Sequence, residues 1–173
     1  MIGNNQGVRV LIATLFVLAF VAAGSAQAAT PAAGSPAAVV ITLKSISAGA
    51  AADDKPPKGV SRGDRLLLRS RLLNVRRQFG RPAGATVGRD QALLVMSSAK
   101  SGRIEGITTL PGGTIRFRGE LGPGGVAGPL SVTGGTGRYA RARGTLIVGE
   151  GDAPLNTYHL RLPAPAESGS PTI

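Results

Sequence analysis

The chain is divided into short apolar runs by turns rich in glycine and proline, and this division limits the folds available to it. Its 173 residues include 26 Gly and 12 Pro, which interrupt long helices and favour turns. Beyond the first 37 residues, the runs predict about eight short strands at close spacing, which is typical of an antiparallel sandwich or barrel. The expected strands are residues 38–47, 65–75, 90–97, 102–110, 114–121, 130–133, 144–148 and 157–162.

Alternation of apolar and polar residues supports this interpretation, most clearly in residues 114–121. Successive side chains of a strand point to opposite faces of its sheet. One face here is apolar, with Ile115, Phe117 and Leu121, and the other is polar, with Thr114, Arg116, Arg118 and Glu120. Residues 49–63, which precede the expected strand 65–75, are rich in Gly, Pro and Asp and predict a loop.

Residues 65–75 fit two periods. Helical spacing produces an apolar stripe that Arg71 interrupts, whereas a period of two separates the residues into two faces. We expect a strand, because every neighbouring run indicates one. The predicted faces are Leu66, Leu68, Ser70, Leu72 and Asn74 on one side and Arg65, Arg69 and Arg71 on the other.

The first 28 residues resemble a secretory signal peptide. A positive charge at Arg9 precedes the mostly apolar run 10–23, and Ala26-Gln27-Ala28 forms a small-x-small cleavage site. That run is shorter than the ~20 residues that span a bilayer. We therefore expect cleavage after Ala28 and a secreted protein without an integral membrane segment. The expected organisation is a flexible lead-in at 29–37, a β-barrel domain at 38–162 and a flexible tail at 163–173.

The charge is strongly positive. Twenty Lys+Arg against nine Asp+Glu give a net charge of +11, and eight arginines lie between Arg62 and Arg89. Such a surface attracts polyanions, but four aromatic residues beyond residue 28 are too few for a nucleic-acid stacking platform. The chain has no cysteine and one histidine, so we expect no disulfide, no thiol nucleophile, no metal site and no cofactor.

Candidates for chemistry are few. Gly59-Val60-Ser61-Arg62-Gly63 matches the GxSxG pattern of a nucleophile elbow, but no strand precedes it and no clear helix follows. We expect Ser61 in a loop and His159 on a polar face. Asp64 and Asp90 lie beside predicted strands, where a carboxylate could serve in general acid–base catalysis. Pairing with arginines at strand ends is the alternative role for both.

Several motifs in order resemble the dirigent proteins and allene oxide cyclases. The strongest is residues 132–144, VTGGTGRYARARG, and the upstream pieces are Gly63-Asp64, residues 88–91 (GRDQ) and residues 112–115 (GGTI) with Gly119. Together they extend over about residues 38–162. The chain therefore resembles a bacterial, secreted, dirigent-like barrel of the allene oxide cyclase type.

This resemblance implies an eight-stranded antiparallel β-barrel, usually a trimer, with a largely apolar cavity open at one end. Members steer reactive small molecules: allene oxide cyclases close an epoxide to a cyclopentenone, and dirigent proteins guide radical coupling. A barrel of eight strands has room for one small ligand. The residues expected to bind a ligand are Leu68, Ser70, Leu94, Phe117 and Tyr158.

Most catalytic residues of the allene oxide cyclases have no counterpart in this chain. The cyclases place a Glu on the first strand, where residues 39–47 contain no carboxylate. Their Asn aligns with Ser70, and their Cys falls near Leu94. True allene oxide cyclase activity is therefore not expected. The Ala-Arg-Gly element of dirigent proteins is retained at residues 142–144, so Arg143 joins Asp64 and Asp90 as a catalytic candidate, with an ion pair at the barrel end as its alternative role.

Two functions remain open at this point. One is a secreted barrel that binds a hydrophobic small molecule and steers its cyclisation or coupling, in the manner of an isomerase or a dirigent protein. The other is a non-catalytic extracytoplasmic module that associates with anionic wall polymers through the basic region.

Overall fold

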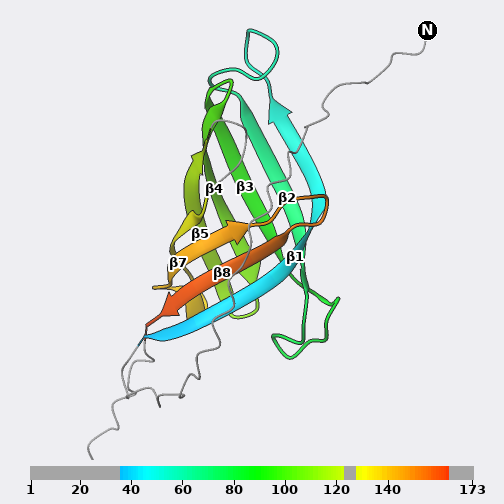
Figure 1. Ribbon diagram of the computed structural model, residues 1–173, viewed down its shortest axis with the longest axis vertical. Helices are drawn as coiled ribbons and strands as arrows, with labels where there is room; N and C mark the ends of the chain where they lie inside the picture. Colours follow the sequence, from blue (N-terminus) through cyan, green and yellow to red (C-terminus); the bar gives the residue numbers. More distant parts are fainter. Residues whose placement is uncertain (1–35, 123–127, 164–173) are drawn as a thin grey trace, which may run out of the picture. The chain divides into compact units, whose positions relative to one another are not determined.

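The chain forms a closed barrel of eight antiparallel strands that follow one another in sequence order (Figure 1). The computed structural model describes residues 36–122 and 128–163; the expected signal peptide and nearly all of the expected tail lie outside these residues. The strands are β1 (Ala37–Asp53), β2 (Arg65–Asn74), β3 (Thr86–Ser98), β4 (Ser101–Leu110), β5 (Gly113–Leu121), β6 (Leu130–Gly135), β7 (Arg143–Val148) and β8 (Leu155–Leu162). The predicted fold class is confirmed.

Side chains alternate between a packed interior and an exposed exterior. The interior core is built from apolar residues of β1 to β8, among them Leu43, Leu72, Ile115, Leu146 and Tyr158. The ambiguous segment is the strand β2, whose even-numbered residues face the interior while its arginines are exposed. None of the helices that the structure describes is both long and apolar enough to span a membrane.

The prediction of a loop beginning at Gly49 is wrong, because β1 continues to Asp53. A bulge between Ser47 and Gly49 shifts the register, and residues 49–53 then pair with residues 69–65 of β2. Gly49 has a φ of 142°, a conformation that residues with a β-carbon rarely adopt. The hydrogen bonds supplied by β2 override the weak strand propensity of this Ala-rich stretch.

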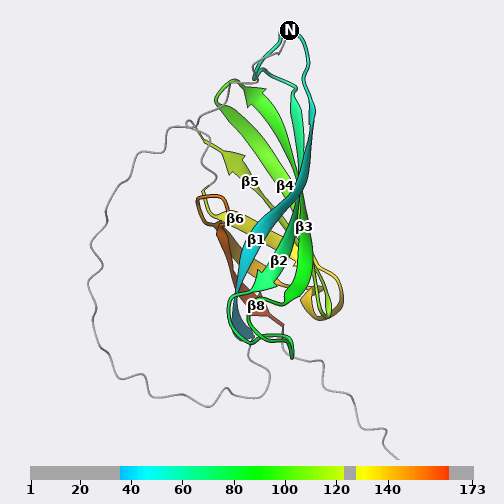
Figure 2. The same cartoon turned by 90° about the vertical axis from the view of Figure 1, so that its right-hand side faces the viewer.

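The strands differ greatly in length, so the barrel wall is uneven. β1 pairs with β8 only over residues 37–44, whereas its pairing with β2 extends from Leu43 to Asp53. In Figures 1 and 2, β8 lies along one half of β1, while β2, β3 and β4 continue beyond it. Five longer strands therefore form one side of the lumen, and the shorter β6, β7 and β8 form the other.

The glycine-rich segment 134–137 joins β6 to β7 through the short 3-10 helix η1 (Gly137–Tyr139). The backbone N–H groups of Thr136 and Arg138 donate to the carbonyl oxygens of Thr114 and Gly112, at 3.0 and 2.9 Å. A β-carbon at Gly137 would collide with the Gly112 carbonyl oxygen. These glycines therefore allow the turn to pack closely against the β4–β5 turn.

Candidate functional site

Four polar side chains meet inside the barrel: Asp90 on β3, Thr108 on β4, and Asn156 and Tyr158 on β8. All four are buried, and Asp90 is 8% exposed. Asp90 and Thr108 are direct cross-strand neighbours, while Asn156 and Tyr158 lie two residues apart and therefore share one face of β8. We call these residues the lumen cluster.

Hydrogen bonds connect the cluster across the lumen. The Thr108 and Tyr158 hydroxyl oxygens are 2.8 Å apart. The Tyr158 hydroxyl donates to Oδ1 of Asp90 at 3.4 Å, and the Asn156 amide donates to Oδ2 at 3.2 Å. Because β3 and β8 are not neighbours in the barrel, the fold brings these groups together only when the sheet closes.

Burial changes the proton affinity of two members of the cluster. Desolvation raises the pKa of Asp90 from 3.8 to about 6, against the opposing effect of hydrogen bonds from Thr108, Tyr158 and Asn156. Burial and the nearby Asp90 carboxylate raise the pKa of Tyr158 well above its usual range. Near neutral pH the carboxyl group can therefore accept or donate a proton, while the phenol stays protonated.

The cluster has one unused hydrogen-bonding atom. Oδ1 of Asn156 is buried and has no hydrogen-bond partner in the structure. A buried acceptor without a donor costs about 1–3 kcal/mol. The site is therefore ready to receive one more hydrogen-bond donor.

A cavity of about 480 Å³ lies at the ends of β1, β2 and β3, and the carboxylates of Asp53, Asp54 and Asp64 line it together with apolar side chains. Its walls include Val60, Leu66, Leu94, Met96 and Leu121. Leu68, on the inward face of β2, is 36% exposed, so solvent reaches this level of the barrel. The next inward residue of β2, Ser70, lies opposite Asp90.

The five residues predicted to bind a ligand all belong to the inward-facing positions of their strands. Leu68 and Ser70 lie on β2 and Leu94 lies on β3. Phe117 and Tyr158 are in the buried core. Tyr158 contacts Asp90, and Ser70 is the cross-strand neighbour of Asp90. Leu94 lines the cavity of about 480 Å³.

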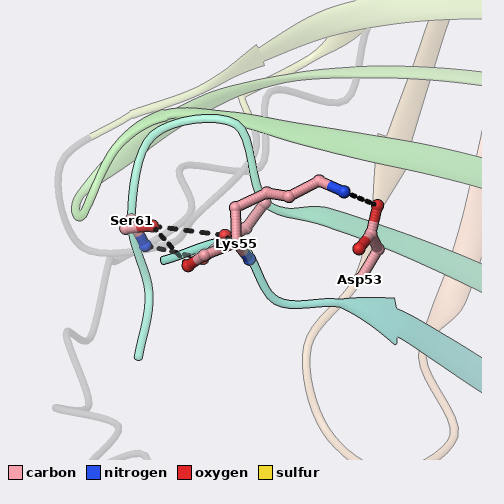
Figure 3. A network of polar contacts seen from close by, with 4 residues as sticks. Asp53, Lys55 and Ser61 are labelled. Carbon is pink, nitrogen blue, oxygen red and sulfur yellow. Dashed lines mark hydrogen bonds and ion pairs between the residues drawn. The ribbon is translucent and has the colours of Figure 1, made fainter. Parts of the chain in front are cut away.

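Asp64 is not part of the lumen cluster and organises the β1–β2 loop through Lys55 and Ser61, the loop residues labelled in Figure 3. Its carboxylate accepts hydrogen bonds from the backbone N–H groups of Lys55 and Ser61, at 2.8 and 2.7 Å, and from the Ser61 hydroxyl at 3.2 Å. These bonds lower the pKa of Asp64. Ser61 is thus a loop residue that contacts Asp64, and His159 is exposed on β8 opposite Val40.

Arg143 also holds backbone in place. Its Nη1 donates to the carbonyl oxygens of Thr133 and Ala142, at 2.8 and 2.9 Å. The side chain is on the outward face at the start of β7. Of the three catalytic candidates, Asp90 is buried in the lumen cluster, and Asp64 lines the cavity of about 480 Å³. Among the residues that the structure describes, no group of three or more His, Cys, Asp or Glu side chains could hold a metal ion.

Solved structures with the same arrangement are found, although no protein-family model and no curated protein sequence matches the chain. A pyocyanin demethylase is 25% identical, with a TM-score of 0.58, and the match covers 70% of this chain and 99% of that one. A pterocarpan synthase dirigent protein is 12% identical over 79% and 98% of the two chains, with a TM-score of 0.53.

A third solved structure is the Diels Alderase AbmU from Streptomyces koyangensis, which is 20% identical over 79% of this chain and 74% of that one, with a TM-score of 0.54. The chain has a dirigent- and cyclase-like barrel fold. The resemblance inferred from the ordered glycine motifs is therefore confirmed at the level of the fold. Dirigent-like barrels share the closed sheet; what each one acts on depends on the side chains inside it.

Proposed function

We propose that this barrel binds a hydrophobic small molecule in its lumen and steers its cyclisation or coupling. The observation that carries the proposal is Asp90, a carboxyl group with a pKa of about 6 that is buried inside the barrel, on the same strand as Leu94 and Met96 of the cavity wall. A few polar groups in a concave apolar site are typical of small-molecule binding.

The lumen cluster supplies orientation and a proton. When protonated, Asp90 donates a hydrogen bond to a carbonyl or ether oxygen of the ligand; when ionised, it accepts one from a hydroxyl group. Tyr158 and Asn156 hold the carboxyl group in one position. The apolar walls limit the conformations of the ligand, and a fixed reactive conformer lowers the barrier of a cyclisation.

The names of the similar structures support this class of chemistry. One is a Diels Alderase, one a pterocarpan synthase dirigent protein and one a demethylase of pyocyanin. The inward positions of β1 near the lumen cluster are Ile41, Leu43 and Ser45, which contain no carboxylate. The proposal therefore excludes true allene oxide cyclase activity and assigns the proton to β3 instead.

Native mass spectrometry of the protein purified from its own host tests the proposal, with gentle release of bound species. We expect a stoichiometric lipophilic ligand. The variant Leu68→Trp fills the lumen and should lose it. Ile147→Trp is the control, because Ile147 is an exposed apolar residue of β7 that alternates with the buried Leu146. An empty wild-type protein that also ignores lipids and phenols, or equal occupancy in both variants, would refute the proposal.

We also propose that the protein is secreted and forms a homo-oligomer, with a trimer as the expected state. The signal peptide predicts a secreted chain that begins at Ala29. The intact mass of the exported protein tests the cleavage, and light scattering during size-exclusion chromatography tests the oligomer. A retained N-terminus or a monomer at micromolar concentration would contradict the respective expectation.

A further inference from the structure

The outer face of the sheet has a groove that the lumen does not explain. Its volume is about 430 Å³, and it extends over β2 to β5. Leu67, Leu93 and Ile107 form the apolar part of its floor, the carboxylate Glu105 lies among them, and Arg116 and Arg118 lie at one side. Leu93 is 39% exposed and Ile107 is 45% exposed, so this floor is open to solvent.

The register of the strands places arginines on both sides of this floor. Arg69 and Arg71 on β2 and Arg89 on β3 form the first bank. Arg116 and Arg118 on β5 form the second bank, with Arg116 opposite Ile107 of β4. Strands lie about 4.8 Å apart, so β3 and β5 are separated by roughly 10 Å. Ile107 on β4 therefore lies between the two banks, whereas Leu67 and Leu93 share strands β2 and β3 with the first bank.

Most of these charges have no acidic neighbour on the facing strand; the exception is Arg118, which lies opposite Glu105. Arg71 lies directly opposite Arg89, and like charges in that position destabilise a sheet. In residues 36–122 and 128–163 the ion pairs are Lys55 with Asp53 and Arg103 with Glu105, so none of the arginines in the two banks forms an ion pair. The fold thus tolerates a repulsion that a bound anion would relieve.

We propose that this groove binds a flexible polymer of phosphodiester-linked polyols. Guanidinium groups bind phosphate oxygens through paired hydrogen bonds, and the apolar floor contacts the carbon skeleton between successive phosphates. Residues two apart on a strand are separated by about 7 Å, so each bank follows the polymer along the strand direction. The site is distinct from the lumen cluster, because Leu93, Ile107, Arg116 and Arg118 alternate along their strands with inward residues such as Phe117.

Other partners fit the groove less well. A nucleic acid without a duplex needs aromatic side chains on which its bases stack, and Phe117, Tyr139 and Tyr158 are buried. A flat bilayer does not enter a groove between two banks. A second copy of the chain using the same face would bring arginines against arginines, which opposes association.

Binding of a fluorescent glycerol-phosphate oligomer, followed by anisotropy at low salt, tests the proposal. We expect Arg116→Glu to weaken binding at least about tenfold, because it removes one phosphate contact and adds a repulsive charge. Arg161→Glu is the matched control for net charge, since Arg161 is exposed on β8, and it should weaken binding less than about threefold. Equal losses in the two variants would reduce the effect to net charge and overturn the site.

The apolar floor is tested by a second pair of variants. Ile107→Ser should weaken binding of the glycerol-phosphate oligomer, whereas Ile147→Ser, at an exposed position of β7 with nearly the same exposure of 46%, should not. No binding, an unchanged affinity in Ile107→Ser, or tighter binding to inorganic polyphosphate, phosphatidylglycerol vesicles or a single-stranded oligonucleotide would overturn the proposal. Thermal unfolding of each variant confirms that the barrel is intact.

Discussion

The phenol of Tyr158 and the carboxyl group of Asp90 meet in the barrel lumen, with 3.4 Å between the hydroxyl oxygen and Oδ1, although 68 residues separate them in the chain. Tyr158 is fully buried and belongs to the core. The same residue therefore packs the interior and contacts the buried carboxyl group of Asp90. Changes to the lumen cluster should consequently affect stability and ligand binding together.

The buried Asp90 should make stability depend on pH. Its pKa is raised from 3.8 to about 6 in the folded protein, so its favourable contribution is fully present below pH 3.8 and is lost as the pH rises through 6. Asp90→Asn carries no charge and should remove this dependence. The free energy of unfolding of the variant, relative to that of the wild type, should be about 3 kcal/mol higher at pH 8 than at pH 3.8. Urea unfolding at a series of pH values measures the difference, and parallel profiles for both proteins would contradict it.

Removing the hydroxyl groups that donate to Asp90 should raise its pKa further. The hydrogen bonds of Thr108 and Tyr158 favour the ionised carboxyl group, so Thr108→Val and Tyr158→Phe each take away one stabilising partner. Carboxyl carbon NMR across a pH titration measures the change directly. Thr42→Val is a control, because Thr42 pairs with Thr157 rather than with Asp90. A pKa of Asp90 that stays at the wild-type value would show that these hydroxyl groups do not stabilise the carboxylate.

Asp64 should control the order of the β1–β2 loop without affecting the lumen cluster. Asp64→Ala removes the acceptor of three hydrogen bonds, so the amides of Lys55 and Ser61 should exchange with solvent faster. The pKa of Asp64 is lowered in the folded protein. Its ionised carboxylate therefore stabilises the loop at pH values above the ordinary pKa of an aspartate, and this stabilisation is lost as the pH falls through the lowered pKa. Hydrogen exchange measured at each amide tests this. Asp54→Ala is the control, and equal exchange rates in the two variants would argue against the role.

Gly106 should tolerate no side chain while Phe117 is present. A β-carbon at Gly106 would collide with the Phe117 ring and also with the backbone carbonyl oxygen of Gln91, which no change at Phe117 removes. Gly106→Ala should therefore destabilise the barrel by about 1–3 kcal/mol, the usual cost of overpacking. Adding Phe117→Leu makes room and should recover part of the loss in a double-mutant cycle of thermal unfolding. Strict additivity of the two substitutions would show that the ring moves aside freely.

The fold was largely predictable because the alternation of apolar and polar residues in this chain is regular. The inward set of β2, including Leu68, Ser70 and Leu72, follows directly from a period of two. The end of β1 was not predictable, because Gly49 and the alanines after it have low strand propensity. Only pairing with β2 makes this stretch a strand.

The candidate site was predictable in part. Asp90 and Tyr158 were identified as separate candidates, yet nothing in the sequence indicates that they touch, since their contact depends on closure of the sheet. Thr108 and Asn156 were missed, because a lone Thr or Asn in a strand is usually a surface residue. Their place in the alternation, in phase with Leu110 and with Leu160, is the signal that identifies them as inward.

The unequal strands imply that the barrel recognises the two ends of a molecule differently. At the level of the lumen cluster, strands surround the lumen on all sides, and hydrogen bonds hold the polar groups in place. Beyond Lys44, β1 has lost its neighbour β8, and the wall continues on one side only. The polar end of a ligand in the lumen would contact the lumen cluster, whereas its apolar end would extend beyond the short strands β6, β7 and β8. In a homologous series with one head group, affinity should therefore be sensitive to the head and tolerant of chain length.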